Sequence, residues 1–294
     1  MSAASMPSPV QQWKRYLALT KPRILPMVIV TALPVLLLAS AGPPPLALAA
    51  GVLFGIVLVA ASANTLNMYV ERDRDALMVR TRGRPLPAGE ITPRAALVFG
   101  LALSLLGTAL LWWLGGALAA SLGVASILFY VFVYTIWLKP RTVYNAVIGG
   151  AAGAAAPLIA DAAVNGYVGL PGLLLFAIVF FWQPPHVWAI ALYRRDDYAA
   201  AGIPMLPAVV GEETTRRRMV AYTVGLVGVT LLPGLLGLLG PLYLAAAVAL
   251  GAWFLWSGVQ LVRQRSDAAA RAVFRTSLVY LALLYAAMLL DLLL

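Results

Sequence analysis

The chain has 294 residues, of which 62% are hydrophobic and only 11% are charged, with one histidine and no cysteine. Soluble domains are nearer half apolar and a quarter charged, so this composition indicates a membrane protein. The apolar runs are continuous and do not alternate with polar residues, which argues against a transmembrane β-barrel. The lack of cysteine excludes disulfides and thiolate chemistry. A formal net charge of +10 would suggest nucleic acid for a soluble protein, but we expect no nucleic-acid partner for a membrane protein.

Nine segments are apolar enough to cross a membrane, which takes roughly 20 residues per helix. They lie near residues 24–41, 47–68, 95–115, 117–137, 144–162, 168–192, 219–238, 241–262 and 274–293. Only Gly115 and Gly116 separate the third from the fourth, so we expect a tight hairpin there. The sequence therefore predicts an all-α, polytopic membrane protein, with nine transmembrane helices in one bundle and a single domain over residues 1–294.

The basic residues predict how the bundle is oriented. All 21 Lys and Arg residues lie before the first predicted span or in the connections after the second, fourth, sixth and eighth. Because short cytoplasmic loops retain Lys and Arg, we expect the N-terminus inside and the C-terminus outside. Residues 1–22 then form a short cytoplasmic segment with no signal-peptide core and no Arg-rich transit peptide. The expected location is a bacterial inner (cytoplasmic) membrane, with multiple passes.

Polar residues at helical spacing lie at the inner end of the second predicted span. Asn67, Glu71 and Asp75 are four residues apart, so on a helix they share one face, whereas Asp73 points elsewhere. Oxygen ligands stacked in this way suit Mg²⁺, which one or two carboxylates hold together with substrate phosphates. The alternative is that these acids solvate a helix end and pair with the neighbouring arginines. Asn67 lies inside the apolar boundary, which favours a functional role.

A basic run follows directly, with Arg80, Arg82 and Arg84 before the turn at residues 85–89. Arginine presents a planar fork that matches phosphate oxygens. Retention of positive charge in cytoplasmic loops alone would account for basic residues here. It does not account for their crowding beside three acids, and a diphosphate–Mg²⁺ site needs both signs of charge in one pocket.

The sixth predicted span contains Pro184 and Pro185, followed by the sole histidine, His186. Adjacent prolines interrupt a helix's hydrogen bonds, which membranes tolerate where the backbone is buried or lines a cavity. A lone membrane histidine is either an interhelical hydrogen-bond partner or part of a lined pocket, and the flanking tryptophans favour the pocket. The polar residues that follow are Tyr193, Asp196 and Asp197.

The fifth predicted span carries Asn145, Gly149 and Gly153 just after Lys139. Glycines four residues apart indicate close helix packing, and Asn145 is a candidate to line a cavity.

At these residues the chain resembles the UbiA-type membrane prenyltransferase superfamily and, more closely, its branch that farnesylates protohaem IX. The similarity covers residues 17–215 in several specific segments. In chain order these are Leu19-Thr20-Lys21-Pro22-Arg23, Asn67-x₃-Glu71-x₃-Asp75, residues 80–86, residues 138–150, Pro184-Pro185-His186 and residues 197–207. Two departures stand out: Glu71 replaces the superfamily's usual Asp, and Tyr193-x₃-Asp197 replaces its second Asp-x₃-Asp motif.

The resemblance implies transfer of the farnesyl group of farnesyl diphosphate to a vinyl group of protohaem IX (haem b), giving haem O and diphosphate. Mg²⁺ is the implied cofactor, and haem b is a substrate rather than a resident cofactor. The partners are then farnesyl diphosphate, protohaem, the lipid bilayer and, downstream, a haem A synthase. The catalytic, metal-binding residues are then Asn67, Glu71, Asp75 and Asp197, and the expected substrate-binding residues are Arg80, Arg84, Lys139, Asn145, His186, Tyr193 and Asp196.

Three other interpretations remain open at this point. The chain is alternatively a UbiA-type polyprenyltransferase acting on an aromatic acid or a quinone precursor. Broken helices with polar groups also describe membrane carriers, although the acids cluster at one face and not at the midplane. A non-catalytic assembly factor for an oxidase would not need a complete set of acids and arginines.

Overall fold

The computed structural model describes residues 8–39 and 44–294, and every regular element in these two ranges is helical. The long helices are α2 (Leu25–Ala39), α3 (Leu46–Leu77), α4 (Pro93–Leu128), α7 (Leu170–Tyr193), α10 (Glu212–Leu235), α11 (Pro241–Gln264) and α12 (Asp267–Leu293). The shorter elements are α1 (Pro9–Leu19), the π-helix η1 (Phe129–Leu138), α5 (Asn145–Gly153), α6 (Ala155–Asn165), α8 (Arg195–Ala200) and α9 (Leu206–Val210). The end of the first predicted span and residues 1–7 of the N-terminal segment lie outside the described residues.

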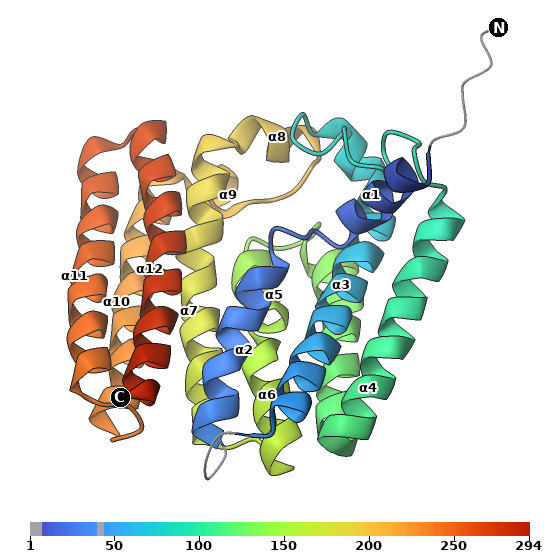
Figure 1. Cartoon of the computed structure of the whole chain (residues 1–294). Helices are drawn as coiled ribbons and strands as arrows, with labels where there is room; N and C mark the ends of the chain where they lie inside the picture. Colours follow the sequence, from blue (N-terminus) through green and yellow to red (C-terminus); the bar gives the residue numbers. More distant parts are fainter. Residues whose placement is uncertain (1–7, 40–43) are drawn as a thin grey trace, which may run out of the picture.

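The helices form one bundle, in which α10, α11 and α12 lie on one side and α3 and α4 on the other (Figure 1). Helix α7 lies between the two sides and packs against α10 and α12, while α2 packs against α6 and α12. The short helices α1, α8 and α9 lie at the same end of the bundle, called here the polar end (Figure 1). The last turn of α12 lies at the opposite end, so α1 and the C-terminus of α12 are separated by the length of the bundle.

Seven helices in the described part of the chain are long and apolar enough to cross a membrane. One of them, Pro93–Leu138, is 46 residues long, but Gly116 inside it has φ 78° and ψ −179°. A Cβ added to Gly123 would lie 3.1 Å from Leu111 Cδ1, whereas twelve residues of straight helix span about 18 Å. The chain therefore folds back at Gly116, at the hairpin that the sequence predicts, and Leu25–Leu38 adds a shorter apolar helix.

Large apolar side chains cover the outside of the bundle. Phe54 is 58% exposed and Trp113 is 84% exposed, and both lie on long apolar helices. Exposed apolar surface of this extent is unfavourable in water but favourable in lipid. The protein is a multi-pass membrane protein.

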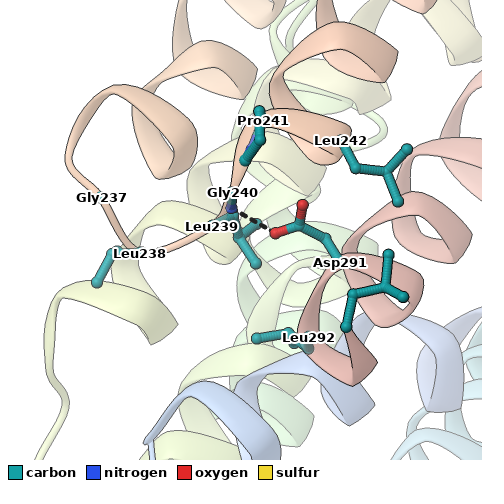
Figure 2. Close-up of a pocket in the computed structure, with 9 residues that line it drawn as sticks. Gly237, Leu238, Leu239, Gly240, Pro241, Leu242, Asp291 and Leu292 are labelled. Carbon is teal, nitrogen blue, oxygen red and sulfur yellow. Dashed lines mark hydrogen bonds between the residues drawn. The ribbon is translucent and has the colours of Figure 1, made fainter.

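Two acids fix helix starts at the end opposite to the polar end. Asp161 on α6 accepts hydrogen bonds from the backbone N–H groups of Gly169 at 2.7 Å and Gly172 at 3.1 Å, where α7 begins. Asp291 on α12 accepts from Tyr243 N at 3.0 Å and from Gly240 N, where α11 begins. Figure 2 shows the Asp291 carboxylate turned toward Gly240 inside a pocket of about 470 Å³. Both acids satisfy N–H groups that a helix start leaves unpaired.

Candidate active site

Helix α3 continues past its apolar part to Leu77 and carries three polar residues on one buried face. Asn67, Glu71 and Asp75 are 1%, 3% and 4% exposed, whereas the side chain of Asp73 is 84% exposed. This division agrees with the helical spacing in the sequence. Carboxylates are almost never fully buried unless they are paired, so each needs a partner.

Asn67, Glu71 and Asp75 each contact a cation that lies outside α3. The pairs are Asn67 Oδ1 with Lys21 Nζ at 2.8 Å, Glu71 with Lys139 Nζ, and Asp75 Oδ2 with Arg84 Nη1 at 2.6 Å. The neighbouring Arg72 pairs instead with the exposed Asp73 at 3.6 Å. The structure therefore does not support the interpretation in which the acids simply pair with the arginines beside them on α3. These three acceptors and three cations form what we call the α3 charge cluster.

Lys21 is a member of this cluster that the sequence-based site does not include. It lies between α1 and α2 with φ 54°, in the left-handed region that non-glycine residues rarely adopt. Burial, together with the nearby Arg84 guanidinium, lowers the pKa of Lys21 to about 7, although Glu71 acts in the opposite direction. Its only signal in the sequence is its place in the Leu-Thr-Lys-Pro-Arg segment.

The π-helix η1 covers the α3 charge cluster from one side. Asn67 Nδ2 donates to Thr135 Oγ1 at 3.0 Å, and the rings of Tyr130 and Tyr134 stack with centroids 5.3 Å apart. Lys139 Nζ lies 5.8 Å from the centroid of the Tyr134 ring. π-Helices are rare and frequently occur at functional sites. The sequence shows these residues only as part of an apolar span, so they are absent from the predicted site.

Asp197 connects α8 to the loop that follows α3. Its Oδ1 accepts a hydrogen bond from the backbone N–H of Val79 at 3.1 Å. Its Oδ2 is buried and accepts no hydrogen bond from the described residues, and its closest cation is Arg194 Nη1 at 3.9 Å. An unsatisfied buried carboxylate oxygen is costly, so this atom is suited to a ligand. Asp196, in contrast, is exposed.

Arg80 and Asn145, two other residues of the predicted site, are not members of the α3 charge cluster. Arg80 is exposed, in the segment between α3 and α4. Asn145 is buried, and its Nδ2 donates to Thr142 O at 2.7 Å and to Pro204 O at 3.3 Å. The Asn145 amide thus joins the start of α5 to the segment before α9, and both of its hydrogen bonds go to backbone.

His186 faces α12. Its Nδ1 lies 2.7 Å from Ser277 Oγ, and the Ser277 hydroxyl donates to Phe274 O at 2.7 Å. Because a hydroxyl has one proton to donate, Ser277 must accept from His186, so Nδ1 carries the proton and Nε2 keeps its lone pair. The imidazole also stacks on Trp182 at 4.4 Å. Helix α7 runs through both prolines without ending.

The donor set decides whether these residues fit a magnesium ion. Within the described residues, no three His, Cys, Asp or Glu side chains come together as a closed metal cage. Glu71, Asp75 and Asp197 are buried carboxylates at one end of the bundle, and Asp197 Oδ2 lacks a hydrogen-bond donor. Mg²⁺ is usually bound by one or two carboxylates and completed by substrate phosphates and water. The residues fit a shared protein–phosphate site of this kind.

The fold and this charged end define a class of membrane-embedded transferase. The sequence profile of the UbiA prenyltransferase family matches residues 28–285. The match covers most of the chain, and the protein belongs to the UbiA prenyltransferase family.

Some curated relatives match this chain over nearly their whole length, whereas the chain spans about half of others, such as 46% of a protoheme IX farnesyltransferase from Thermus thermophilus. A protoheme IX farnesyltransferase from Acidiphilium cryptum is 48% identical over 285 residues, covering 94% of this chain and 90% of the relative. The protein of the same name from Frankia casuarinae is 46% identical, covering 92% and 95%.

Among solved structures, a digeranylgeranylglyceryl phosphate synthase aligns with a TM-score of 0.79 at 20% identity, covering 96% of this chain and 98% of that one. A UbiA homolog from Archaeoglobus fulgidus bound to DMAPP and Mg²⁺ aligns with a TM-score of 0.70 at 17% identity, covering 95% and 99%. At these identities the structures establish the fold alone.

Proposed function

We propose that the protein transfers the farnesyl group of farnesyl diphosphate to a vinyl group of protohaem IX. Water adds to the other vinyl carbon, so the products are diphosphate and haem O with its hydroxyethylfarnesyl side chain. The observation that carries the proposal is the 48% identity, over nearly the whole chain, to a relative named for this reaction. The α3 charge cluster supports it, because buried acids and cations side by side suit a metal-bound diphosphate.

The acids of the cluster are the proposed metal ligands. Asn67, Glu71 and Asp75 on α3 would hold Mg²⁺ together with Asp197 on α8, all four being buried. When bound, Mg²⁺ would stabilise the negative charge that develops on the departing diphosphate. The family structure bound to DMAPP and Mg²⁺ supports such a metal within this fold.

The cations of the cluster are the proposed diphosphate ligands. Lys139 and Arg84 neutralise Glu71 and Asp75 in the free protein. With Mg²⁺ bound to the carboxylates, the same cations would be free to contact phosphate oxygens, for which arginine in particular has the right geometry. Arg80, exposed at the same end, is free to contact the outer phosphate. The exchange of partners keeps every buried charge compensated before and after substrate binds.

His186 is the proposed contact for the acceptor. Ser277 fixes the tautomer in which Nε2 has a free lone pair. A neutral imidazole whose other nitrogen is held by a hydrogen bond is a common ligand for haem iron. Tyr193, half-buried at the end of α7, would contact the same substrate, with Asn145 and Asp196 beside the donor.

The proposed topology follows from the helices and the charges. Splitting Pro93–Leu138 at Gly116 and counting α2 as a span adds two crossings to the seven long apolar helices. Nine crossings place α1 and the end of α12 on opposite sides, with the basic polar end in the cytoplasm and the C-terminus outside. We infer a single domain in a bacterial inner membrane, acting before a haem A synthase.

An assay of purified protein in membranes tests the proposal. Protohaem, farnesyl diphosphate and Mg²⁺ are supplied, with 4-hydroxybenzoate as a competing acceptor, and products are identified by mass spectrometry. The expected result is a farnesylated haem that forms only with Mg²⁺ and is lost in Asp75→Asn. Prenylation of the aromatic acid alone would replace the acceptor, and no turnover from folded protein would favour a carrier or an assembly factor.

A further inference from the structure

Two arginines, one at the junction of α7 and α8 and one on α12, lie near the same tyrosine ring at the polar end. The guanidinium carbon of Arg194 lies 5.9 Å from the centroid of the Tyr193 ring, and that of Arg271 lies 5.1 Å from it. The two cations are therefore separated by no more than the sum of these distances. We call these two arginines, together with the ring that both of them contact, the Arg194–Arg271 clamp.

The clamp has a surplus of positive charge. Arg271 is exposed and forms no ion pair with any acid in the described residues. The closest carboxylate to Arg194 is Asp197 Oδ2 at 3.9 Å, beyond hydrogen-bond distance. Two like charges close to one ring repel each other, and an anion bound by both guanidiniums would offset the repulsion.

A strip of flat rings continues from the clamp between α7 and α12. Phe274 lies 6.3 Å from Tyr193, His186 lies 4.8 Å from Phe274, and Trp182 lies 4.4 Å from His186, each measured between ring centroids. Aromatic faces of this kind stack on other flat rings. Tyr193, Phe274 and His186 are partly exposed, whereas Trp182 is buried, so the first three rings leave aromatic surface beside the two arginines.

The clamp is a neighbour of the proposed metal site. Arg194 Nη1 of the clamp lies 3.9 Å from Oδ2 of Asp197, which is one of the proposed metal ligands. A molecule held by the clamp would therefore lie beside the proposed diphosphate site without occupying it.

We propose that the Arg194–Arg271 clamp binds the carboxylates of a flat, largely apolar acceptor whose ring system stacks against the aromatic strip. This rests on the proposed function, under which the acceptor is protohaem and the carboxylates are its propionates. Guanidinium groups bind carboxylates in a two-point geometry. With the propionates held there, the edge of the macrocycle that bears the vinyl groups points away from the clamp.

Equilibrium binding of protohaem to detergent-purified protein tests the clamp, followed by the haem absorbance in the absence of farnesyl diphosphate and Mg²⁺. Arg271→Gln removes one cation at an exposed position, so the fold should persist. Arg271→Gln is expected to bind protohaem about tenfold more weakly than wild type does. Arg271→Lys should have an intermediate affinity, because it keeps the positive charge but loses the planar guanidinium group. Protohaem dimethyl ester, whose carboxylates are blocked, should bind wild type and Arg271→Gln equally.

Arg263→Gln is the matched control, since Arg263 is also an exposed arginine at the polar end, in the last turn of α11. It should bind protohaem as wild type does. Unchanged protohaem binding by Arg271→Gln would overturn the clamp alone. The clamp would also be overturned if Arg271→Gln raised the KM for farnesyl diphosphate and left haem binding intact, because the clamp would then serve phosphate. Wild type that neither binds nor farnesylates protohaem would overturn the proposed function and the clamp together.

Discussion

The two ends of the bundle use buried acids in different ways. At the end opposite α1, Asp161 Oδ2 and both carboxylate oxygens of Asp291 accept hydrogen bonds from backbone N–H groups where α7 and α11 begin. At the polar end, Glu71 and Asp75 face the side-chain cations Lys139 and Arg84. A backbone partner is fixed by the helix, whereas a side-chain cation can rotate to another partner. Acids of the first kind hold the fold together, and acids of the second kind are available for a substrate and its metal.

The largest expected effect is on activity, from removing one acid of the polar end. Glu71→Gln keeps the shape of the side chain but loses the charge that pairs with Lys139 and that would hold Mg²⁺. We expect kcat for farnesyl transfer to fall by roughly 100-fold. Asp73→Asn is the matched control on the same helix, because Asp73 is exposed, and it should leave kcat unchanged. Equal losses in both variants would show that the buried face of α3 has no special role.

An acid of the opposite end should affect stability instead. Asp161→Asn replaces the charged acceptor of the Gly169 and Gly172 N–H groups by a neutral amide oxygen, so hydrogen bonds to a charged group are lost. We expect the free energy of unfolding to fall by about 2 kcal/mol, measured by thermal unfolding in detergent. The kcat/KM of the folded fraction should stay as in wild type. A selective loss of activity without a loss of stability would contradict the division between the ends.

A cation of the polar end should affect substrate binding more than chemistry. Arg84→Gln leaves Asp75 without its partner and removes a proposed phosphate contact. We expect about a tenfold higher KM for farnesyl diphosphate, determined at saturating protohaem. Arg72→Gln provides the comparison, since Arg72 pairs with the exposed Asp73, and its KM should not change.

The smallest expected effect concerns the packing that supports Lys139. A Cβ at Gly149 would lie 2.2 Å from the Tyr134 ring, whereas one at Gly150 would lie 3.5 Å from Gln183. Gly149→Ala must therefore displace the ring beside Lys139, at a cost of about 1 kcal/mol. Gly150→Ala should be tolerated. Thermal unfolding of the two variants checks the difference, and identical stabilities would contradict it.

Much of the fold could be predicted, because apolar length and the location of basic residues both follow from the lipid environment. The hairpin at Gly116 and the shared face of Asn67, Glu71 and Asp75 could be predicted for a similar reason, since local spacing decides them. Arg84 and Lys139 could also be predicted as site residues, whereas the pairing of each cation with one acceptor could not, because spacing along one helix does not reveal which segment packs against it. The role of Lys21 could not be predicted either.

Some details depend on interactions that have no local signature at all. The π-helix η1 is part of an apolar span in the sequence, so the roles of Thr135 and Tyr134 are visible only once η1 packs on α3. Ser277 lies 91 residues from His186, and only the folded chain shows that it fixes the imidazole tautomer. The ligand assignments of Asn67, Glu71, Asp75 and Asp197 remain predictions.

Binding of Mn²⁺, a paramagnetic substitute for Mg²⁺, tests the contrast between the two ends most directly. The metal is titrated into wild type, Asp75→Asn and Asp291→Asn with and without inorganic diphosphate, and free Mn²⁺ is measured by electron paramagnetic resonance. We predict diphosphate-dependent binding in wild type and in Asp291→Asn, and its loss in Asp75→Asn. Equal binding in all three proteins, or a loss in Asp291→Asn as large as that in Asp75→Asn, would contradict the assignment of exchangeable acids to the polar end.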